Sequence, residues 1–504
     1  MAEKLTPSQK MAVENRGGKL LVSAAAGSGK TKVLVDRLMS YLTDPVTPAS
    51  LDDFLIITYT KAAAAELRGK ISDKLAAYIA EHPENRHMQQ QIQRLYLAKI
   101  STVHAFCADL LREYAYKLDI SADFRIAEEN ECQEMMRSVL DKLLDEAYEA
   151  YLDNAPFRAF VDTQGLGRDD RQVPEIILQI YSSALCHLEP EKWLDWCVSV
   201  SNVNGLSEAS ETLWGAYLIA DLHHFLDMQI DTLEKCIQMC QDVEGFEKPV
   251  SLLGVTICDL KSLRSCNTWD AIVKHPPIAY GTLTFKKDIK GTPLAEQIKA
   301  VRNNCKDSVT KKLRAFSGTS SDILEQLRHS ALACEGLVTL VQAFRKEYSK
   351  LKQARRVLDF SDIEQKTLDL LLGKNRSSIT GAASEIADRF REIMVDEYQD
   401  SNEVQDAIFG ALTQKRNNCF MVGDVKQSIY QFRLADPGIF LEKYNSYMPA
   451  EVATAGEGRK VALSSNFRSS AGVISAVNDV FQRCMSVNVG GLSYGADEML
   501  YEGI

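Results

Sequence analysis

The stretch from Ser23 to Thr31, SAAAGSGKT, contains the residue types that bind the phosphates of a nucleotide. Glycines in this stretch let backbone N–H groups approach phosphate oxygens, because glycine has no Cβ in the way. A lysine here can reach the β- and γ-phosphates, and a threonine hydroxyl can bind Mg²⁺. We therefore predict a phosphate-binding loop in which Lys30 contacts phosphate and Thr31 holds the metal, formed by Ala24, Ala25, Ala26, Gly27, Ser28, Gly29, Lys30 and Thr31.

Two adjacent acids, Asp396 and Glu397, follow an apolar run much later in the chain. Phosphoryl chemistry needs a ligand for the metal and a group that activates water, and carboxylates suit both tasks. We predict that Asp396 binds Mg²⁺ and that Glu397 orients or deprotonates the attacking water. Two acids at the end of a strand could instead be simple caps, but the phosphate-binding loop favours the chemical role.

Gln427 and Arg468 are candidates for contact with the γ-phosphate. Gln427 lies three residues after Asp424, just past a predicted strand, where its amide could detect whether hydrolysis has occurred. An arginine beside the transferred phosphate can raise the rate about 10³–10⁵-fold. We expect the strand before Arg468 to open a second α/β domain, so that this arginine acts when the two domains close.

Aromatic and hydroxyl side chains near the ends of predicted strands could bind nucleic acid. Tyr430 and Phe432 could stack on bases, at roughly 1–3 kcal/mol per base, or could belong to the core. His104 could contact a ligand or could be a hydrogen-bonded structural histidine. Other polar residues in equivalent positions are Thr58, Tyr59, Thr60, Ser101 and Thr102.

Short apolar runs followed by helical patterns must position these residues. Such runs begin near residues 19, 53, 99, 391, 418 and 460. Strands that alternate with helices form parallel sheets, and the carboxyl ends of the strands then share one edge, where ligands bind. The sequence therefore predicts an α/β fold in which the phosphate-binding loop, the acids and the polar residues meet at one edge.

Residues 108–356 have a different character. Long amphipathic helical patterns dominate, such as 131–150 and 213–240, and we find no internal repeat. The segment 286–314 is strongly basic, which is typical of a solvated face or of phosphate contacts along nucleic acid. Its cations are Lys286, Lys287, Lys290, Lys299, Arg302, Lys306, Lys311, Lys312 and Arg314.

The composition is that of a soluble globular protein, with 504 residues, 45% of them hydrophobic and 25% charged. No run of 18 apolar residues occurs, and the start, MAEKLTPSQK, lacks an apolar signal core, so we predict a cytoplasmic protein with no membrane span. The net charge of −11 counts mildly against a nucleic-acid binder but permits a local basic channel. Among the 12 cysteines, Cys236 and Cys240 fit buried thiols better than a metal site.

Eight motifs occur in the order found in the superfamily 1A DNA helicases, the UvrD/Rep/PcrA group, and the chain resembles them. The motifs are LTPSQ, AGSGKT, ITYTKAAAAELR, ISTVHAFC, LDFSDIE, VDEYQD, VGDVKQSIYQFR and SNFRSS. The long helical insert and the run GDVKQSIYQFRLADP are most similar to the AddA family, the helicase–nuclease subunits of bacterial AddAB complexes.

The resemblance implies an ATP- and Mg²⁺-dependent helicase that moves 3′ to 5′ on DNA, acts in double-strand break repair and recombination, and pairs with an AddB-type subunit. It implies that Gln9 contacts adenine and that Phe467 can stack on it. Asp396, Glu397, Gln427 and Arg468 keep the roles given above. Residues implied to contact single-stranded DNA are Tyr59, Thr60, Thr102, His104 and Phe432.

The resemblance also implies boundaries: a RecA-like ATPase domain in 1–107 and 357–455, a helical insert in 108–356 that faces duplex DNA, and the beginning of a second RecA-like domain in 456–504. Phe432 stands where simpler helicases have Trp, and Lys61-Ala62 replaces a common Asn-Lys. We find neither the later helicase motifs nor the nuclease, and therefore expect weak hydrolysis. The alternatives are a UvrD/PcrA-like repair helicase without a nuclease and a nucleotide-gated DNA-binding module.

Overall fold

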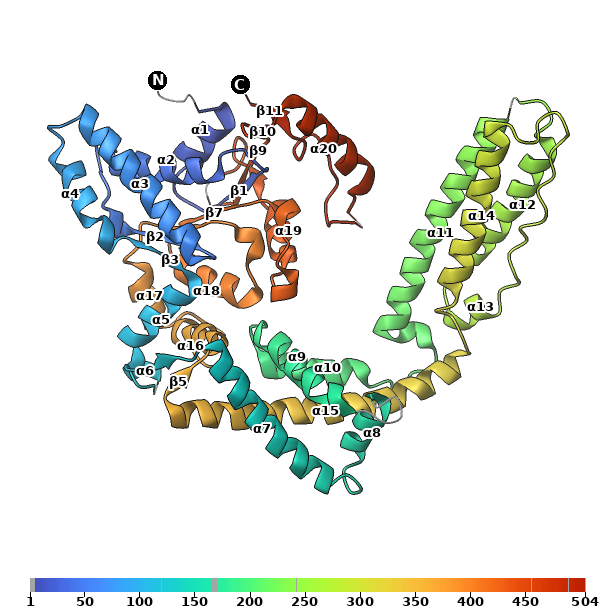
Figure 1. Ribbon diagram of the computed structural model, residues 1–504, viewed down its shortest axis with the longest axis horizontal. Helices are drawn as coiled ribbons and strands as arrows, with labels where there is room; N and C mark the ends of the chain where they lie inside the picture. Colours follow the sequence, from blue (N-terminus) through green and yellow to red (C-terminus); the bar gives the residue numbers. More distant parts are fainter. Residues whose placement is uncertain are drawn as a thin grey trace. The chain divides into compact units, whose positions relative to one another are not determined.

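The computed structural model describes residues 5–503 except 119, 165–169, 242, 455 and 488. The chain forms two compact units, shown in Figure 1. The sheet unit contains residues 1–140, 179–191 and 345–504, and the helical unit contains residues 141–178 and 192–344. The helical unit is therefore smaller than the predicted insert, because residues 108–140 pack with the sheet.

A seven-stranded parallel sheet forms the centre of the sheet unit, as predicted for an α/β fold. Its strand order is β3-β2-β6-β7-β1-β9-β8, and each neighbouring pair is parallel. The loop-bearing strand β1 thus lies between β7 and β9, and the strand that carries the acids, β6, lies beside β7. The strands are β1 (Leu20–Ala24), β2 (Phe54–Thr58), β3 (Lys99–Thr102), β6 (Glu392–Val395), β7 (Cys419–Gly423), β8 (Met448–Pro449) and β9 (Arg459–Leu463).

Helices cover both faces of this sheet (Figure 1). Side chains alternate along a strand, so Leu21 faces a core formed with α5 and α16–α19, whereas Leu20 and Val22 face a core formed with α1–α4. Burial on both faces explains why β1, β2, β6 and β7 are continuous apolar runs in the sequence. The helices are α1 (Pro7–Glu14), α2 (Lys30–Leu42), α3 (Lys61–Glu81), α4 (Arg86–Arg94), α5 (Val103–Glu113), α16 (Phe360–Leu372), α17 (Gly381–Ala387), α18 (Glu403–Thr413) and α19 (Pro437–Ser446).

The strand that we expected to open a second domain belongs to this sheet instead. β9 pairs in parallel with β1 and places Val461 beside Val22. Without β9, the outer side of β1 would expose unpaired backbone N–H and C=O groups. The segment that contains Arg468 therefore emerges at the carboxyl edge of the sheet that carries the phosphate-binding loop. That the residues after β9 begin a second domain stays a prediction.

Smaller elements complete the sheet unit. Two short parallel pairs join segments distant in sequence, β4 with β5 and β10 with β11. The final helix, α20, precedes β11 in the chain. These elements are α6 (Ala115–Leu118), β4 (Arg125–Ile126), the part of α7 (Glu129–Glu149) up to residue 140, β5 (Val357–Leu358), β10 (Ser465–Asn466), α20 (Ala471–Cys484) and β11 (Tyr501–Glu502).

The helical unit has its own apolar core, in which α11, α12 and α14 supply most of the side chains. Thr212 caps α11 by accepting a hydrogen bond from the Gly215 N–H, and Thr292 with Pro293 begins α14. Cys236 and Cys240 are buried in this core, as predicted. The helices are α8 (Ala155–Gln164), α9 (Val173–Leu185), α10 (Pro190–Ser201), α11 (Leu213–Cys240), α12 (Glu247–Arg264), α13 (Trp269–Val273), α14 (Pro293–Leu313) and α15 (Ser320–Arg355), of which α9, α10 and α15 also contribute residues to the sheet unit. Among the described residues, none of the helices is long and apolar enough to span a membrane.

A buried ion pair connects the helix after the phosphate-binding loop to the strand before the acids. Arg37 of α2 is fully buried, and its Nε donates to Glu392 Oε2 of β6 at 2.8 Å while its Nη2 pairs with Oε1 at 2.5 Å. The remaining Nη1 donates to the backbone oxygens of Ala12 and Asn15, and the Tyr41 hydroxyl donates to Glu392. Every charged atom thus has a partner, which a buried pair requires.

We expect Arg37→Met to lower the free energy of opening of α2 and β6 by about 3–5 kcal/mol, because it leaves Glu392 charged and buried. Hydrogen exchange of peptides from both elements, followed against urea concentration, measures this loss. The control is Lys415→Met, which removes the half-exposed pair with Asp388 and should cost less than about 1 kcal/mol. Equal effects of the two substitutions would contradict the role given to Arg37.

Candidate nucleotide-binding site

The phosphate-binding loop lies between β1 and α2, where the sequence predicts it. Gly27 and Gly29 have φ angles of 70° and 85°, which non-glycine residues rarely adopt. Gly29 is the N-cap of α2, and no described side chain caps this helix. The N–H groups of its first turn therefore remain available to a ligand, and the helix dipole favours an anion there.

Neighbouring chain segments approach this loop so closely that its glycines cannot carry a side chain. A Cβ on Gly27 would lie 2.9 Å from the Arg468 Cβ, and one on Gly29 would lie 3.2 Å from Gln9 Nε2. Asn466 Nδ2 donates to the Ala26 carbonyl at 2.8 Å, and the loop's Gly27 carbonyl accepts from the Phe467 N–H at 2.9 Å. The segment after β9 thus holds the loop directly.

Gln9 supports the loop from the other side. Its side chain is 3% exposed, its Oε1 accepts from the Thr6 N–H at 3.0 Å, and its Nε2 donates to the Ser28 carbonyl at 3.0 Å. The bond with Thr6 is one half of the capping box of α1, and the bond with Ser28 joins that helix to the loop. The contact with adenine implied by the resemblance stays a prediction.

Lys30 and Glu397 meet across the site, although 366 residues separate them in the sequence. The Lys30 Nζ lies 2.7 Å from Glu397 Oε2. Glu397 adopts φ 50°, in the left-handed region that is costly for a residue with a side chain. The bend directs the chain from β6 into the short helix η5 (Tyr398–Asp400) and leaves the carboxylate at the loop.

Asp396 lies at the end of β6, and its Oδ1 accepts the Glu397 N–H at 3.0 Å. Burial and the neighbouring Glu397 carboxylate raise the pKa of Asp396 to about 6, and Lys30 opposes the shift in part. The same two causes, burial first, raise the pKa of Asp400 to about 6. The Glu397 carboxylate thus raises the pKa of two neighbouring acids, and Lys30 supplies a positive charge beside them.

Gln399 is a site residue that our sequence reasoning missed. It is 2% exposed, its Nε2 donates to Glu397 Oε2 at 2.9 Å, and its Oε1 accepts the Asp424 N–H at 2.9 Å. Asp424 Oδ2 in turn accepts from Gln427 Nε2 at 2.7 Å. A chain of hydrogen bonds therefore runs from Glu397 to Gln427. The motif VDEYQD contains Gln399, but nothing in its spacing distinguishes a linking role from a structural one.

A cavity of about 520 Å³ opens over the loop. The structure brings most predicted residues together there, and it adds Lys32 and Lys70, which no sequence signal identified. Five other predicted residues of the site do not line the cavity, namely Gln9, Ala24, Ala25, Ser28 and Asp396. The lining consists of Ala26, Gly27, Gly29, Lys30, Thr31, Lys32, Lys70, Glu397, Gln427, Phe467 and Arg468.

The predicted DNA contacts divide into two sets. Thr60 and Thr102 cap α3 and α5, and the Tyr59 hydroxyl forms a hydrogen bond with Ser401, so their polar atoms already have local partners. His104 Nε2 lies 3.2 Å from Glu364 Oε1, which fits a structural histidine, while its ring contacts Phe360.

Phe432 differs from these residues because its side chain is 75% exposed, so it is no core aromatic. It lies in η7 (Gln431–Arg433), and its ring centroid is 5.9 Å from that of the half-buried Tyr430. Two aromatic rings thus follow shortly after Gln427 in the sequence, the residue at which the hydrogen-bond chain described above ends.

In the basic segment 286–314, four cations have partners among the described residues. Lys312 pairs with Asp221, and Arg302 donates to the Tyr280 carbonyl. Lys286 and Lys299 form looser pairs with Glu247 and Glu296, at 4.0 and 3.7 Å. Whether the remaining cations contact nucleic acid stays a prediction.

The parallel sheet, the loop at the end of β1 and the acids at the end of β6 define a RecA-like P-loop nucleotide-binding domain. Residues 5–448 match the family model of the UvrD/REP helicase N-terminal domain. The chain therefore belongs to the UvrD-helicase family.

Curated proteins of similar sequence share one name. Three curated relatives are named as the A subunits of ATP-dependent helicase/nucleases. They come from Pelotomaculum thermopropionicum, Bacillus cytotoxicus and Clostridium novyi, and are 38%, 35% and 33% identical to this chain. Each alignment covers 99% of this chain and 40–41% of the relative. The chain thus spans about two fifths of the length of these relatives.

We expect Gln399→Met to lower the rate of ATP hydrolysis by about tenfold or more with little change in nucleotide affinity. The substitution keeps the volume but removes a hydrogen bond to the charged Glu397, worth about 1.5–3 kcal/mol, and we predict that Glu397 positions the attacking water. Single-turnover hydrolysis and nucleotide titration separate the two quantities. Gln91→Met is the control, because Gln91 is also 2% exposed but bonds Leu51, away from the site.

We expect the affinity for Mg²⁺ with nucleotide to rise from pH 5 to pH 7 with a midpoint near 6. The pKa of Asp396 is raised to about 6, and a proton on this carboxylate competes with the metal, so binding strengthens as the proton leaves. Asp396→Asn should weaken binding and flatten the profile, whereas Asp400→Asn should retain the rise. Metal-dependent nucleotide titrations across this range measure it, and a flat profile for the unsubstituted protein would contradict the assignment.

Proposed function

We propose that this chain is the ATP-binding part of a DNA helicase or translocase. The observation that carries the proposal is the hydrogen-bond chain from Glu397, the partner of Lys30, through Gln399 and Asp424 to Gln427, which precedes the exposed Phe432 closely in the sequence. A nucleotide-binding protein that does not move along nucleic acid has no use for an exposed aromatic residue such as Phe432 shortly after Gln427, the residue proposed to contact the γ-phosphate.

ATP and Mg²⁺ fit the residues present. The lysine and the free N–H groups at the start of α2 suit a triphosphate, and the neighbouring carboxylates suit a divalent cation. Among the described residues, no group of three or more His, Cys, Asp or Glu side chains could hold a metal unaided. Asp396 and the Thr31 hydroxyl would hold Mg²⁺ here, together with phosphate oxygens of the nucleotide.

In this proposal Lys30 exchanges its Glu397 partner for phosphate oxygens when ATP binds. The released Glu397 carboxylate, still held by Gln399, then orients the attacking water. Arg468 and Gln427, which line the same cavity, stabilise the charge on the γ-phosphate. Because Arg468 follows a strand of the same sheet, it can act without the closure of a second domain, contrary to our expectation from sequence.

We propose that single-stranded DNA stacks on Phe432 and Tyr430 and passes the strand ends that carry Tyr59, Thr60, Thr102 and His104. Bound or hydrolysed nucleotide would shift Gln427, and the short chain from Gln427 to Phe432 would transmit the shift to the stacked base. Translocation would run 3′ to 5′, as the resemblance implies.

The name of the relatives designates one component of a helicase/nuclease, which supports the presence of a second component, and we infer one of the AddB type. We further propose that the complex acts on DNA ends in repair and recombination in the cytoplasm, that nuclease activity belongs to the whole protein, and that duplex DNA contacts the helical unit.

The test pairs one substitution in the phosphate-binding loop with one at the exposed aromatic residue. Lys30→Ala should abolish ATP binding and leave single-stranded DNA binding, whereas Phe432→Ala should weaken DNA binding by about 1–3 kcal/mol and leave ATP binding. Nucleotide titration and fluorescence anisotropy of an oligothymidylate measure both. Ile429→Ala, at a residue 69% exposed and three positions away, is the matched control and should change neither. Undiminished ATP binding by Lys30→Ala, or DNA binding unaffected by Phe432→Ala, would refute the proposal.

A further inference from the structure

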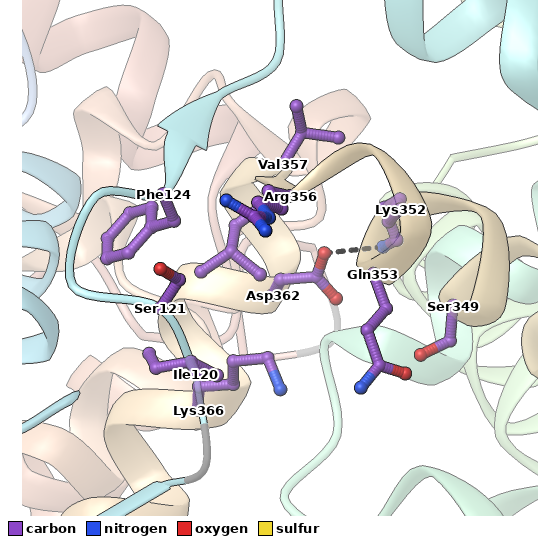
Figure 2. A pocket seen from close by; sticks show the side chains of 11 residues that line it. Ile120, Ser121, Phe124, Ser349, Lys352, Gln353, Arg356, Val357, Asp362 and Lys366 are labelled. Carbon is purple, nitrogen blue, oxygen red and sulfur yellow. Dashed lines mark ion pairs between the residues drawn. The ribbon is translucent and has the colours of Figure 1, made fainter. Parts of the chain in front are cut away.

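A second polar cavity, of about 280 Å³, lies in the sheet unit and shares no lining residue with the nucleotide cavity. We call it the α15–α16 pocket. It lies among the loop before β4, the last turns of α15, β5 and α16 (Figure 2). Its lining is Ile120, Ser121, Phe124, Ser349, Lys352, Gln353, Arg356, Val357, Leu358, Asp362 and Lys366.

The charges of this pocket are unbalanced. Three cations line it against one carboxylate, Asp362, and Lys352 already neutralises that acid at 2.6 Å. Lys352, which is 3% exposed, also pairs with Asp359 at 2.7 Å, so it is fixed in place. The other two cations, Arg356 and Lys366, form no ion pair or side-chain hydrogen bond with any residue that the structure describes.

Arg356 occupies a position that favours glycine. It follows the last residue of α15 with φ 53°, in the left-handed region where helices commonly end on glycine. An arginine there costs conformational energy that glycine would not. Strain of this kind at a site lined by other polar groups points to a use for the side chain, whose guanidinium lies at the pocket in Figure 2. The acid whose charge interacts with Arg356, Asp123, is exposed and accepts a hydrogen bond from Ser121.

The pocket is also separate from the predicted DNA track. Phe360 and Glu364 of α16 contact His104. Asp362 and Lys366 lie two positions further along, and residues two apart on a helix face in different directions. A ligand in the pocket would therefore contact a different side of α16 from the side that faces His104 of α5.

We propose that the α15–α16 pocket binds a phosphate group, with Arg356 and Lys366 as its charged ligands and the hydroxyl of Ser349 as a further donor. The planar guanidinium matches phosphate oxygens in pairs, and lysine serves as a point charge. The apolar side chains of Ile120, Phe124 and Val357 line the same cavity and would contact the group esterified to the phosphate. The phosphate belongs either to a free phosphate ester or to the backbone of a nucleic acid.

The test titrates inorganic phosphate by calorimetry into the Lys30→Ala protein, with chloride at equal ionic strength as the reference. Lys30→Ala removes phosphate binding at the nucleotide loop, so the remaining heat reports the second pocket. Adding Arg356→Gly or Lys366→Met should weaken phosphate binding about tenfold or more, because each removes a hydrogen bond to a charged group. Arg355→Ala is the matched control, since it removes the same charge one residue away from the lining and should leave the affinity within twofold.

Arg356→Gly also excludes misfolding as the cause, because glycine is preferred at φ 53° and the variant should unfold at the same or a higher urea concentration. A second titration with thymidine 5′-monophosphate and with an oligothymidylate separates the sources. If Arg356→Gly and Lys366→Met weaken the binding of both the monophosphate and the oligothymidylate, the pocket binds a nucleic-acid backbone. If they weaken the binding of the monophosphate alone, the pocket binds a free phosphate ester. Absence of phosphate binding in the Lys30→Ala protein, or equal affinity in Arg356→Gly, Lys366→Met and Arg355→Ala, would overturn the proposal.

Discussion

The buried pair between Arg37 and Glu392 is the interaction on which the nucleotide site depends. Arg37 lies two turns into the helix that begins at the phosphate-binding loop, and Glu392 begins the strand that ends at Asp396 and Glu397. A bidentate pair is sensitive to both distance and angle, so it fixes α2 against β6. The 2.7 Å contact between Lys30 and Glu397 at the other end of both elements follows from that alignment.

The same alignment explains how a loop near residue 27 and acids near residue 396 can form one site. Strand β7 lies between β1 and β6, and the hydrogen bonds of Gln399 cross it at its carboxyl end. The close approach requires Gly423, where a Cβ would lie 2.3 Å from Gln399 Oε1. The glycine before Asp424 is therefore a consequence of the bridging amide, and the site is built from three adjacent strand ends rather than from one motif.

The sequence was sufficient for the parts of the site that depend on local chemistry. Glycines, Lys30 and Thr31 identify a phosphate loop by type and spacing, and continuous apolar runs identify strands buried on both faces. It was insufficient for Gln399 and Lys70, because their roles arise from strands and helices that meet only in the folded chain. The sequence also did not predict that β9 pairs with β1, since an apolar run carries no information about which strand it will join.

The position of β9 in the sheet bears on how Arg468 can act. If Arg468 belonged to a separate domain, its distance from the γ-phosphate would depend on domain closure, and nucleotide binding would gate its contribution. In the structure β9 pairs with β1, and the loop's Gly27 carbonyl accepts a hydrogen bond from the residue before Arg468. The arginine is therefore tied to the loop by the backbone. In our proposal the gating group is Lys30, which gives up its ion pair with Glu397 before it binds phosphate.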